Sequence, residues 1–271
     1  MEKKHYLVHI CLIFTVLLTL GPFIWMVLTS FKTFEESISL PITILPQVWY
    51  PYNYPDVWSR FPFPNFYVNT FIVVVMTVVL QVFICSLAAY AFARLEFPFK
   101  NALFILCLAL MMIPGQIFLI PHFHIMVSLG LTNSVTALWL PRIFGAFGTF
   151  LLRQFFMSLP KSLDEAAKLD GCNFFQIYWL ILMPLMKPAL ISLSILTGLA
   201  AWRDLMWPLI VNTRADTLTL SAGLAMLIGE HTTIFPHVMA ASTMAIWPMI
   251  VIFFILQKRF IEGIAITGSK E

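Results

Sequence analysis

The sequence predicts an all-α, polytopic membrane protein with six transmembrane helices and a short cytoplasmic helix between the fourth and fifth of them. Of its 271 residues, 60% are hydrophobic and 11% are charged, and the mean hydropathy is +0.89. Soluble domains carry about a quarter charged residues, so most of this chain must lie in lipid. The net charge of +3 is too small to indicate a nucleic-acid partner.

Six segments are long and apolar enough to cross a bilayer, which takes about 20 residues. They cover roughly 7–30, 66–93, 102–121, 134–155, 188–211 and 236–257. The first is too long for the apolar part of a signal peptide, and no cleavage pattern follows it. The second is the clearest, because every residue between Arg60 and Arg94 is uncharged. The third and fourth share a charge-free stretch, in which the Gly and Asn of 127–134 predict the break.

The Lys and Arg residues predict the orientation, because cytoplasmic loops carry an excess of them. With the N-terminus inside, the inner segments hold eleven and the outer segments five. The inner residues are Lys3, Lys4, Arg94, Lys100, Arg153, Lys161, Lys168, Lys187, Lys258, Arg259 and Lys270; the outer residues are Lys32, Arg60, Arg142, Arg203 and Arg214. Six spans return the chain to the inside, so both termini are predicted to be cytoplasmic.

The remaining features predict a single transmembrane domain over residues 1–271. There is no internal repeat, and the outer loop at about 32–65 is rich in Pro, Tyr and Trp, which suits a stiff cap at the membrane interface. The four cysteines form no CxxC pair, so no disulfide is expected. His122 and His124 lack a third nearby ligand, so no metal site is expected, and Glu230-His231 is predicted to be solvated rather than catalytic.

A short charged helix is predicted at 163–170, inside the cytoplasmic loop at about 156–187. Ser162 followed by Glu165 matches a capping box, and Gly171 suits a left-handed helix end. Leu163, Ala166, Ala167 and Asp170 would share one face.

A second amphipathic helix is predicted from Asn173 to Leu182, before Pro184 and Pro188 interrupt the backbone. Local physics leaves two interpretations of this loop open, a hairpin that only connects two spans and an element that docks on a partner.

The same loop resembles the signature of membrane subunits of binding-protein-dependent ABC importers. The matching residues are Glu165-Ala166-Ala167, Gly171, Ile181 and Pro184, with Met183 where the family has Leu. Further stretches resemble the maltose-permease-like carbohydrate branch of that family, namely AAYAFARLEFP (88–98), FLLRQFFMSLPKSLDEAAKLDG (150–171), LMPLMKPAL (182–190) and LQKRFIEGI (256–264).

The resemblance implies that the charged helix is a coupling helix, seated on a cytoplasmic ATPase subunit. Its coupling residues would be Glu165, Ala166, Ala167, Asp170 and Gly171. The partners implied are a second permease, related but not identical, two ATP-binding subunits, an extracytoplasmic solute-binding protein and a sugar. No GxxxxGK[ST] pattern occurs, so ATP and Mg²⁺ are expected on the partner ATPase subunits, and no cofactor is expected in this chain.

The charged pair in AAWRDLMWPLI is the candidate translocation path. A charge inside a span is by default a functional-site hypothesis, and Trp202, Arg203 and Asp204 would line or gate the path. The family pattern is Trp-Asn-Asp, so Arg203 departs from it. The alternative is an Arg–Asp pair at the interface that holds the fifth span against the partner permease.

The predicted function is sugar import across the cytoplasmic membrane of a bacterium or archaeon, by a transport subunit that is not itself an enzyme. Import of another solute, such as glycerol phosphate, is the alternative within the family. A secondary carrier is the alternative from another class. It would need ion-coupling carboxylates near the middle of the membrane, and Asp204, which lies off-centre, is the only acid well inside a predicted span.

Overall fold

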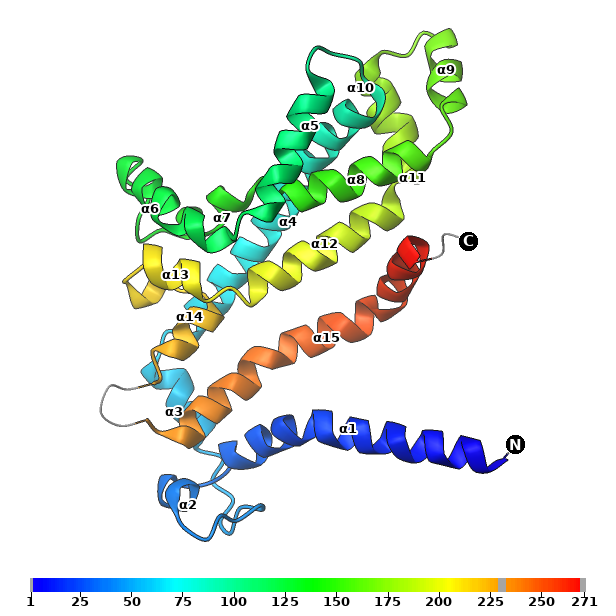
Figure 1. Cartoon of the computed structure of the whole chain (residues 1–271). Helices are drawn as coiled ribbons and strands as arrows, with labels where there is room; N and C mark the ends of the chain where they lie inside the picture. The colour runs from blue at the N-terminus through cyan, green and yellow to red at the C-terminus, as the bar shows by residue number, and fades with distance from the viewer. Residues whose placement is uncertain (1, 229–232, 269–271) are drawn as a thin grey trace. The chain divides into compact units, whose positions relative to one another are not determined.

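The computed structural model describes residues 2–228 and 233–268, so Glu230 and His231 lie outside the described residues (Figure 1). The described chain is built from helices joined by turns, as predicted. The α-helices are α1 (Glu2–Ser30), α2 (Phe34–Ile38), α3 (Asn53–Arg60), α4 (Phe63–Arg94), α5 (Lys100–Ala109), α6 (Leu119–Ser128), α7 (Val135–Trp139), α8 (Ala146–Ser158), α9 (Ser162–Leu169), α10 (Phe174–Gln176), α11 (Met183–Leu185), α12 (Lys187–Trp202), α13 (Met206–Val211), α14 (Leu220–Ala225) and α15 (Phe235–Gly268).

Three helical stretches are each long and apolar enough to cross a membrane, and three bent helix pairs raise the number to six. The single helices are Val8–Ser30, Phe63–Arg94 and Phe235–Ile255. The bent pairs are Lys100–Met112 with Gly115–Ser128 at 98°, Val135–Arg142 with Ala146–Ser158 at 46°, and Phe174–Leu185 with Lys187–Trp202 at 79°. The predicted all-helical, polytopic fold class is confirmed.

The bends are the main difference from the predicted continuous spans. The predicted third span at 102–121 bends sharply at Pro114, which lacks a backbone N–H and forces Ile113 into an extended conformation (φ −88°, ψ 124°). The break predicted at 127–134 is confirmed, since Gly130 and Asn133 adopt positive φ values of 67° and 57° between α6 and α7.

The chain divides into two compact units, of which the first comprises residues 1–64 and 220–252. Within it, the outer loop is ordered by buried Asn53, whose amide donates to the carbonyl oxygens of Ser30 (2.8 Å), Lys32 (2.9 Å) and Tyr50 (3.3 Å). Glu36 accepts from the Gln47 N–H at 2.8 Å. These bonds give the loop the fixed shape that its aromatic and proline content predicts.

The second unit comprises residues 65–219 and 253–271 and contains both predicted functional sites. One of its cores joins α4, α8, α9 and α12 with a π-helical segment at Ile177–Leu182. Tyr178 lies in the middle of this core, fully buried, and its hydroxyl is 2.7 Å from that of Ser86. Helices α9 and α13 lie at opposite ends of this unit (Figure 1). The two sites are therefore separated within one packed body.

Candidate functional site

Helix α9 carries the predicted coupling residues and ends as the sequence predicts. Gly171 adopts φ +80°, and its N–H donates to the Lys168 carbonyl at 3.1 Å. The Cys172 N–H donates to the Ala167 carbonyl at 2.9 Å. These two bonds form a Schellman motif, which satisfies carbonyl groups at the helix end. Any other residue at position 171 would have to place its backbone in the left-handed conformation that glycine adopts readily.

The predicted capping box at the start of α9 is wrong. Lys161 is the N-cap residue, and Ser162 is already helical, so its side chain does not cap the helix. The Asp164 and Glu165 N–H groups instead donate to the Lys161 carbonyl at 3.0 and 3.2 Å. The turn at Pro160 starts the helix one residue earlier than the Ser-x-x-Glu pattern implies.

The outward face of α9 differs from the face predicted by spacing. Ala167 is 3% exposed and packs in the core beside Tyr178, and Asp164 is also buried. Glu165, Ala166, Leu169 and Asp170 are exposed. Leu169 is 90% exposed, which is unusual for a leucine on a helix that ends in a tight turn. The structure therefore separates Ala166 from Ala167, which the spacing placed on one face.

A buried ion pair attaches α9 to the last residue of α4. The Arg94 guanidinium lies 3.3 Å from the Asp164 carboxylate, and the two side chains are only 5% and 12% exposed. Arg94 also donates to the Leu159 carbonyl at 2.8 Å. This pair fixes α9 to the end of α4. No local pattern in the sequence indicates this pair, because 69 residues lie between the two partners along the chain.

The helix predicted from Asn173 to Leu182 is α10 followed by the π-helical segment. Asn173 and Gln176 form a capping box, with the Gln176 N–H donating to Asn173 Oδ1 (2.9 Å) and the Asn173 N–H to Gln176 Oε1 (2.8 Å). The Asn-x-x-Gln spacing was a visible signal for this start. The wider π turn lets Ile177, Tyr178 and Leu182 all face the core.

The second site lies where two spans are broken. Asp204 follows α12 and Arg142 precedes α8, and their side chains meet at 2.8 Å with 18% and 31% exposure. The alternative interpretation paired Asp204 with Arg203, but Arg203 is exposed and forms no ion pair in the described part of the chain. Trp202 ends α12 and is half-buried. The structure thus adds Arg142 to this site, whereas the sequence pointed to it only as one of the outer charges that predict the membrane orientation.

Helix α13 is attached to α7 beside this ion pair. The Trp207 indole N–H donates to the Ala137 carbonyl at 2.9 Å in a buried contact. The Asn212 amide donates to the Ser134 carbonyl at 3.2 Å, and Asn133 Oδ1 accepts from the Thr213 N–H at 2.6 Å. The short α13 therefore has a fixed position relative to the α7 side of the break.

A cavity of about 320 Å³ lies next to Arg142 and joins α4, α8 and α12. Its polar lining includes Thr77, Gln81 and Thr197, and its aromatic lining includes Phe144 and Phe147. The buried hydroxyl of Thr77 has no hydrogen-bond partner among the described residues. Hydroxyl, amide and aromatic groups of this kind suit a sugar.

Replacement of Arg203 by asparagine, which restores the family residue, is expected to have a small effect. The side chain is exposed and has no ion pair in the described chain, so the stability should change by no more than about 0.5 kcal/mol. Uptake by cells with equal protein levels should stay within about twofold of wild type. A larger change in uptake at unchanged stability would place Arg203 in the translocation path.

Three comparisons with known proteins bear on the family and the fold of the chain. The family described as "Binding-protein-dependent transport system inner membrane component" matches residues 81–265. The chain is 32% identical to the arabinooligosaccharides transport system permease protein AraQ of Halalkalibacterium halodurans, over 98% of this chain and 96% of that protein. It is 31% identical to the sn-glycerol-3-phosphate transport system permease protein UgpE of Yersinia pestis, over 94% of each.

A solved structure of a bacterial ABC transporter involved in the import of the acidic polysaccharide alginate has the same fold. Its matching chain superimposes with a TM-score of 0.84, and the match covers 96% of this chain and 97% of that chain at 24% identity.

Proposed function

Because the chain belongs to the family of binding-protein-dependent transport system inner membrane components, we propose that it imports a sugar or oligosaccharide as one half of a permease pair. As a member of this family, the chain is a multi-pass permease subunit of an ABC importer in the cytoplasmic membrane. The resemblance found in the sequence is thereby confirmed, and a secondary carrier is excluded. The cargo, the sidedness of the termini and the coupling contact belong to the proposal.

The likeness to an arabinooligosaccharide permease over nearly the whole chain carries the proposal of a sugar. The cavity beside Arg142, with its hydroxyl, amide and aromatic groups, suits such a cargo. Glycerol phosphate is the second candidate, favoured by the likeness to the glycerol-3-phosphate permease over 94% of the chain.

In the proposed mechanism, a solute-binding protein delivers the cargo on the outer side, and both termini of this chain lie in the cytoplasm. Two partner subunits bind ATP and Mg²⁺ and supply the energy. Helix α9 seats its exposed residues Glu165, Ala166, Leu169 and Asp170 on one of these subunits. Gly171 gives the helix its tight end, and Ala167 holds it on the core. The Arg94–Asp164 pair then transmits the movement of α9 to α4.

The cargo can be identified by co-purification of the complete importer. Its ATPase activity in lipid vesicles should be stimulated by an arabino-oligosaccharide together with the cognate binding protein. Glycerol 3-phosphate serves as the competing candidate under the same conditions. Stimulation by glycerol phosphate alone would replace the sugar proposal by the second candidate.

Leu169→Asp tests whether the outward face of α9 docks on the ATPase. Leu169 is 90% exposed, so the substitution should leave folding intact but remove an apolar anchor from the contact. We expect uptake to fall roughly fivefold, the factor that corresponds to a loss of about 1 kcal/mol in the contact, with unchanged protein in the membrane. Leu169→Met keeps the apolar side chain and should import normally. Equal uptake by both variants would contradict docking through this face.

A further inference from the structure

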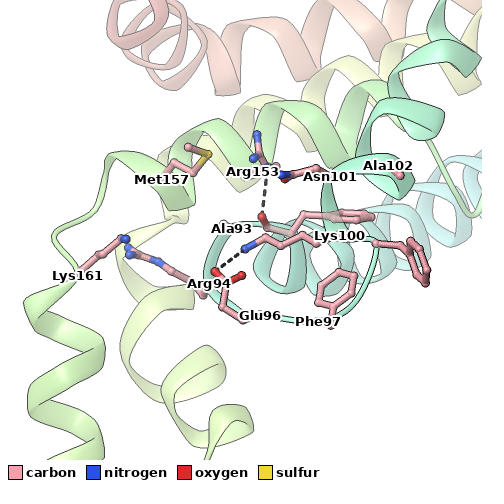
Figure 2. Close-up of a pocket in the computed structure, with 12 residues that line it drawn as sticks. Ala93, Arg94, Glu96, Phe97, Lys100, Asn101, Ala102, Arg153, Met157 and Lys161 are labelled. Carbon is pink, nitrogen blue, oxygen red and sulfur yellow. Dashed lines mark hydrogen bonds and ion pairs between the residues drawn. The ribbon is translucent and has the colours of Figure 1, made fainter.

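A cavity of about 530 Å³ opens where α4 ends, α5 begins and α8 ends (Figure 2). These three helix ends belong to the second, third and fourth spans, so the alternation of spans places all of them at one membrane surface. The cavity belongs neither to the proposed translocation path nor to the outward face of α9. Its lining is polar and strongly basic, which raises the question of what ligand it holds.

Four cationic side chains and one carboxylate line the cavity, namely Arg94, Lys100, Arg153, Lys161 and Glu96. Two of the cations are neutralised, since Lys100 lies 3.1 Å from Glu96 and Arg94 lies 3.3 Å from Asp164. Arg153 and Lys161 have no ion-pair partner within the described residues. The cavity therefore presents two uncompensated positive charges.

Donor groups without acceptors point to an anion as the ligand. Arg94 offers none of them to the cavity, because its side chain is 5% exposed and its terminal nitrogens already contact the Asp164 carboxylate and the Leu159 carbonyl. The Arg153 guanidinium stacks on Phe104, with its central carbon 4.0 Å from the ring centre, and its Nε donates to the Phe92 carbonyl at 3.2 Å. Its two terminal nitrogens have no hydrogen-bond acceptor among the described residues. The N–H groups of Asn101 and Ala102, in the first turn of α5, likewise have no acceptor there. A helix start with free N–H groups beside an arginine fork is suited to a phosphate group.

The apolar surroundings favour a lipid as the carrier of that phosphate. Phe99 lies at the rim, 80% exposed, in the left-handed conformation (φ 61°) that turns the chain into α5. Along α5, Leu103, Ile105 and Leu106 are also exposed, as expected of side chains that face acyl chains. Basic pockets between membrane helices on the cytoplasmic side bind the headgroups of anionic lipids.

We propose that this cavity binds the phosphate of an anionic phospholipid, with Arg153 and Lys161 supplying the charge and the first turn of α5 supplying N–H donors. The lipid would connect the ends of three spans close to α9 and would stabilise the base on which that helix sits. This site is independent of the cargo, so it stands even if the proposed sugar is wrong.

The test measures lipid retention by the complete importer, purified in detergent, with native mass spectrometry. Phosphatidylglycerol should remain bound to the wild-type complex, whereas phosphatidylcholine, which has the same phosphate but no net charge, should be lost. Lys161→Gln should lower retention of phosphatidylglycerol roughly fivefold, and Arg153→Gln by a similar factor. Lys187→Gln removes the same charge from an exposed lysine outside the cavity and should leave retention unchanged.

Inorganic phosphate provides the remaining arm of this experiment. At equal concentration it should not displace phosphatidylglycerol, because it lacks the acyl chains that contact α5. Full displacement by phosphate would show that the site takes a free anion and would overturn the lipid proposal. Equal retention in Lys161→Gln, Arg153→Gln and Lys187→Gln would overturn the site itself. Because the readout involves neither ATP nor cargo, failure of the sugar proposal gives a different result.

Discussion

Replacing Arg94 by leucine should destabilise the folded protein by roughly 3–5 kcal/mol, the cost of leaving a buried charge without its partner. The Asp164 side chain is only 12% exposed, and the substitution leaves its carboxylate without a counter-charge. It also removes the donor to the Leu159 carbonyl. Helix α9 should separate from α4, and uptake should fall to background. The free energy of unfolding can be measured by titration of the purified importer with SDS in mixed micelles.

A double variant separates the ion pair from general damage to the core. Arg94→Leu with Asp164→Leu removes both charges, so it should recover part of the stability lost in the single variant. Glu96→Gln is the control, because it breaks an ion pair whose carboxylate side chain is 90% exposed and should cost less than about 1 kcal/mol. Equal losses in the double and the single variant would show that the pair itself contributes nothing.

Replacing Asp204 by alanine should have the second large effect, a roughly tenfold loss of uptake with about 2 kcal/mol of lost stability. The loss of stability follows from the 2.8 Å charged hydrogen bond to Arg142, which is half-buried at the break between two spans. The loss of uptake follows because Arg142 would no longer be held at the cavity that joins α4, α8 and α12. A change of about 1.4 kcal/mol at one transport step corresponds to tenfold. Uptake of the labelled cargo by cells with equal protein levels measures the effect.

Two further variants decide how Asp204 acts. Asp204→Glu keeps the charge and should recover most of the uptake, whereas Arg142→Met should reproduce the defect of Asp204→Ala. Normal uptake in Arg142→Met would show that Asp204 acts without its ion-pair partner, and would favour direct contact with the cargo.

The features that the sequence predicted well depend on local chemistry. Hydropathy located the three helices that are long enough to cross a membrane, and its other three segments overlap the bent helix pairs, although the predicted 188–211 runs past the end of the pair Phe174–Trp202. Gly130 and Asn133 located a turn, since positive φ favours these residue types. Gly171 ended α9 for the same reason. At the start of that helix two local signals competed, and the Pro160 turn prevailed over the Ser162 capping box. At Asn173 the reverse error occurred, because a real capping box was not recognised.

The features that it could not supply depend on contacts between distant segments. Arg94 and Asp164, like Arg142 and Asp204, are brought together only when separate spans pack. The direction of Ala167 was equally hidden, because the spacing of a two-turn helix fits more than one buried face. The bend at Pro114 could be anticipated, but its 98° angle depends on the packing of α5 and α6. A proline marks where a helix breaks and leaves the direction of the next helix to its neighbours.

Because Ala167 points into the core, mutations at the two alanines of the Glu-Ala-Ala motif should be suppressed by changes in different genes. A defect at Ala167 arises inside this chain, where the residue packs beside Tyr178, so compensating changes should map to the same gene. A defect at Ala166 or Leu169, both exposed, should instead be suppressed by changes in the gene of the ATPase subunit. Mutations at two neighbouring residues of one motif would then have suppressors in two different genes.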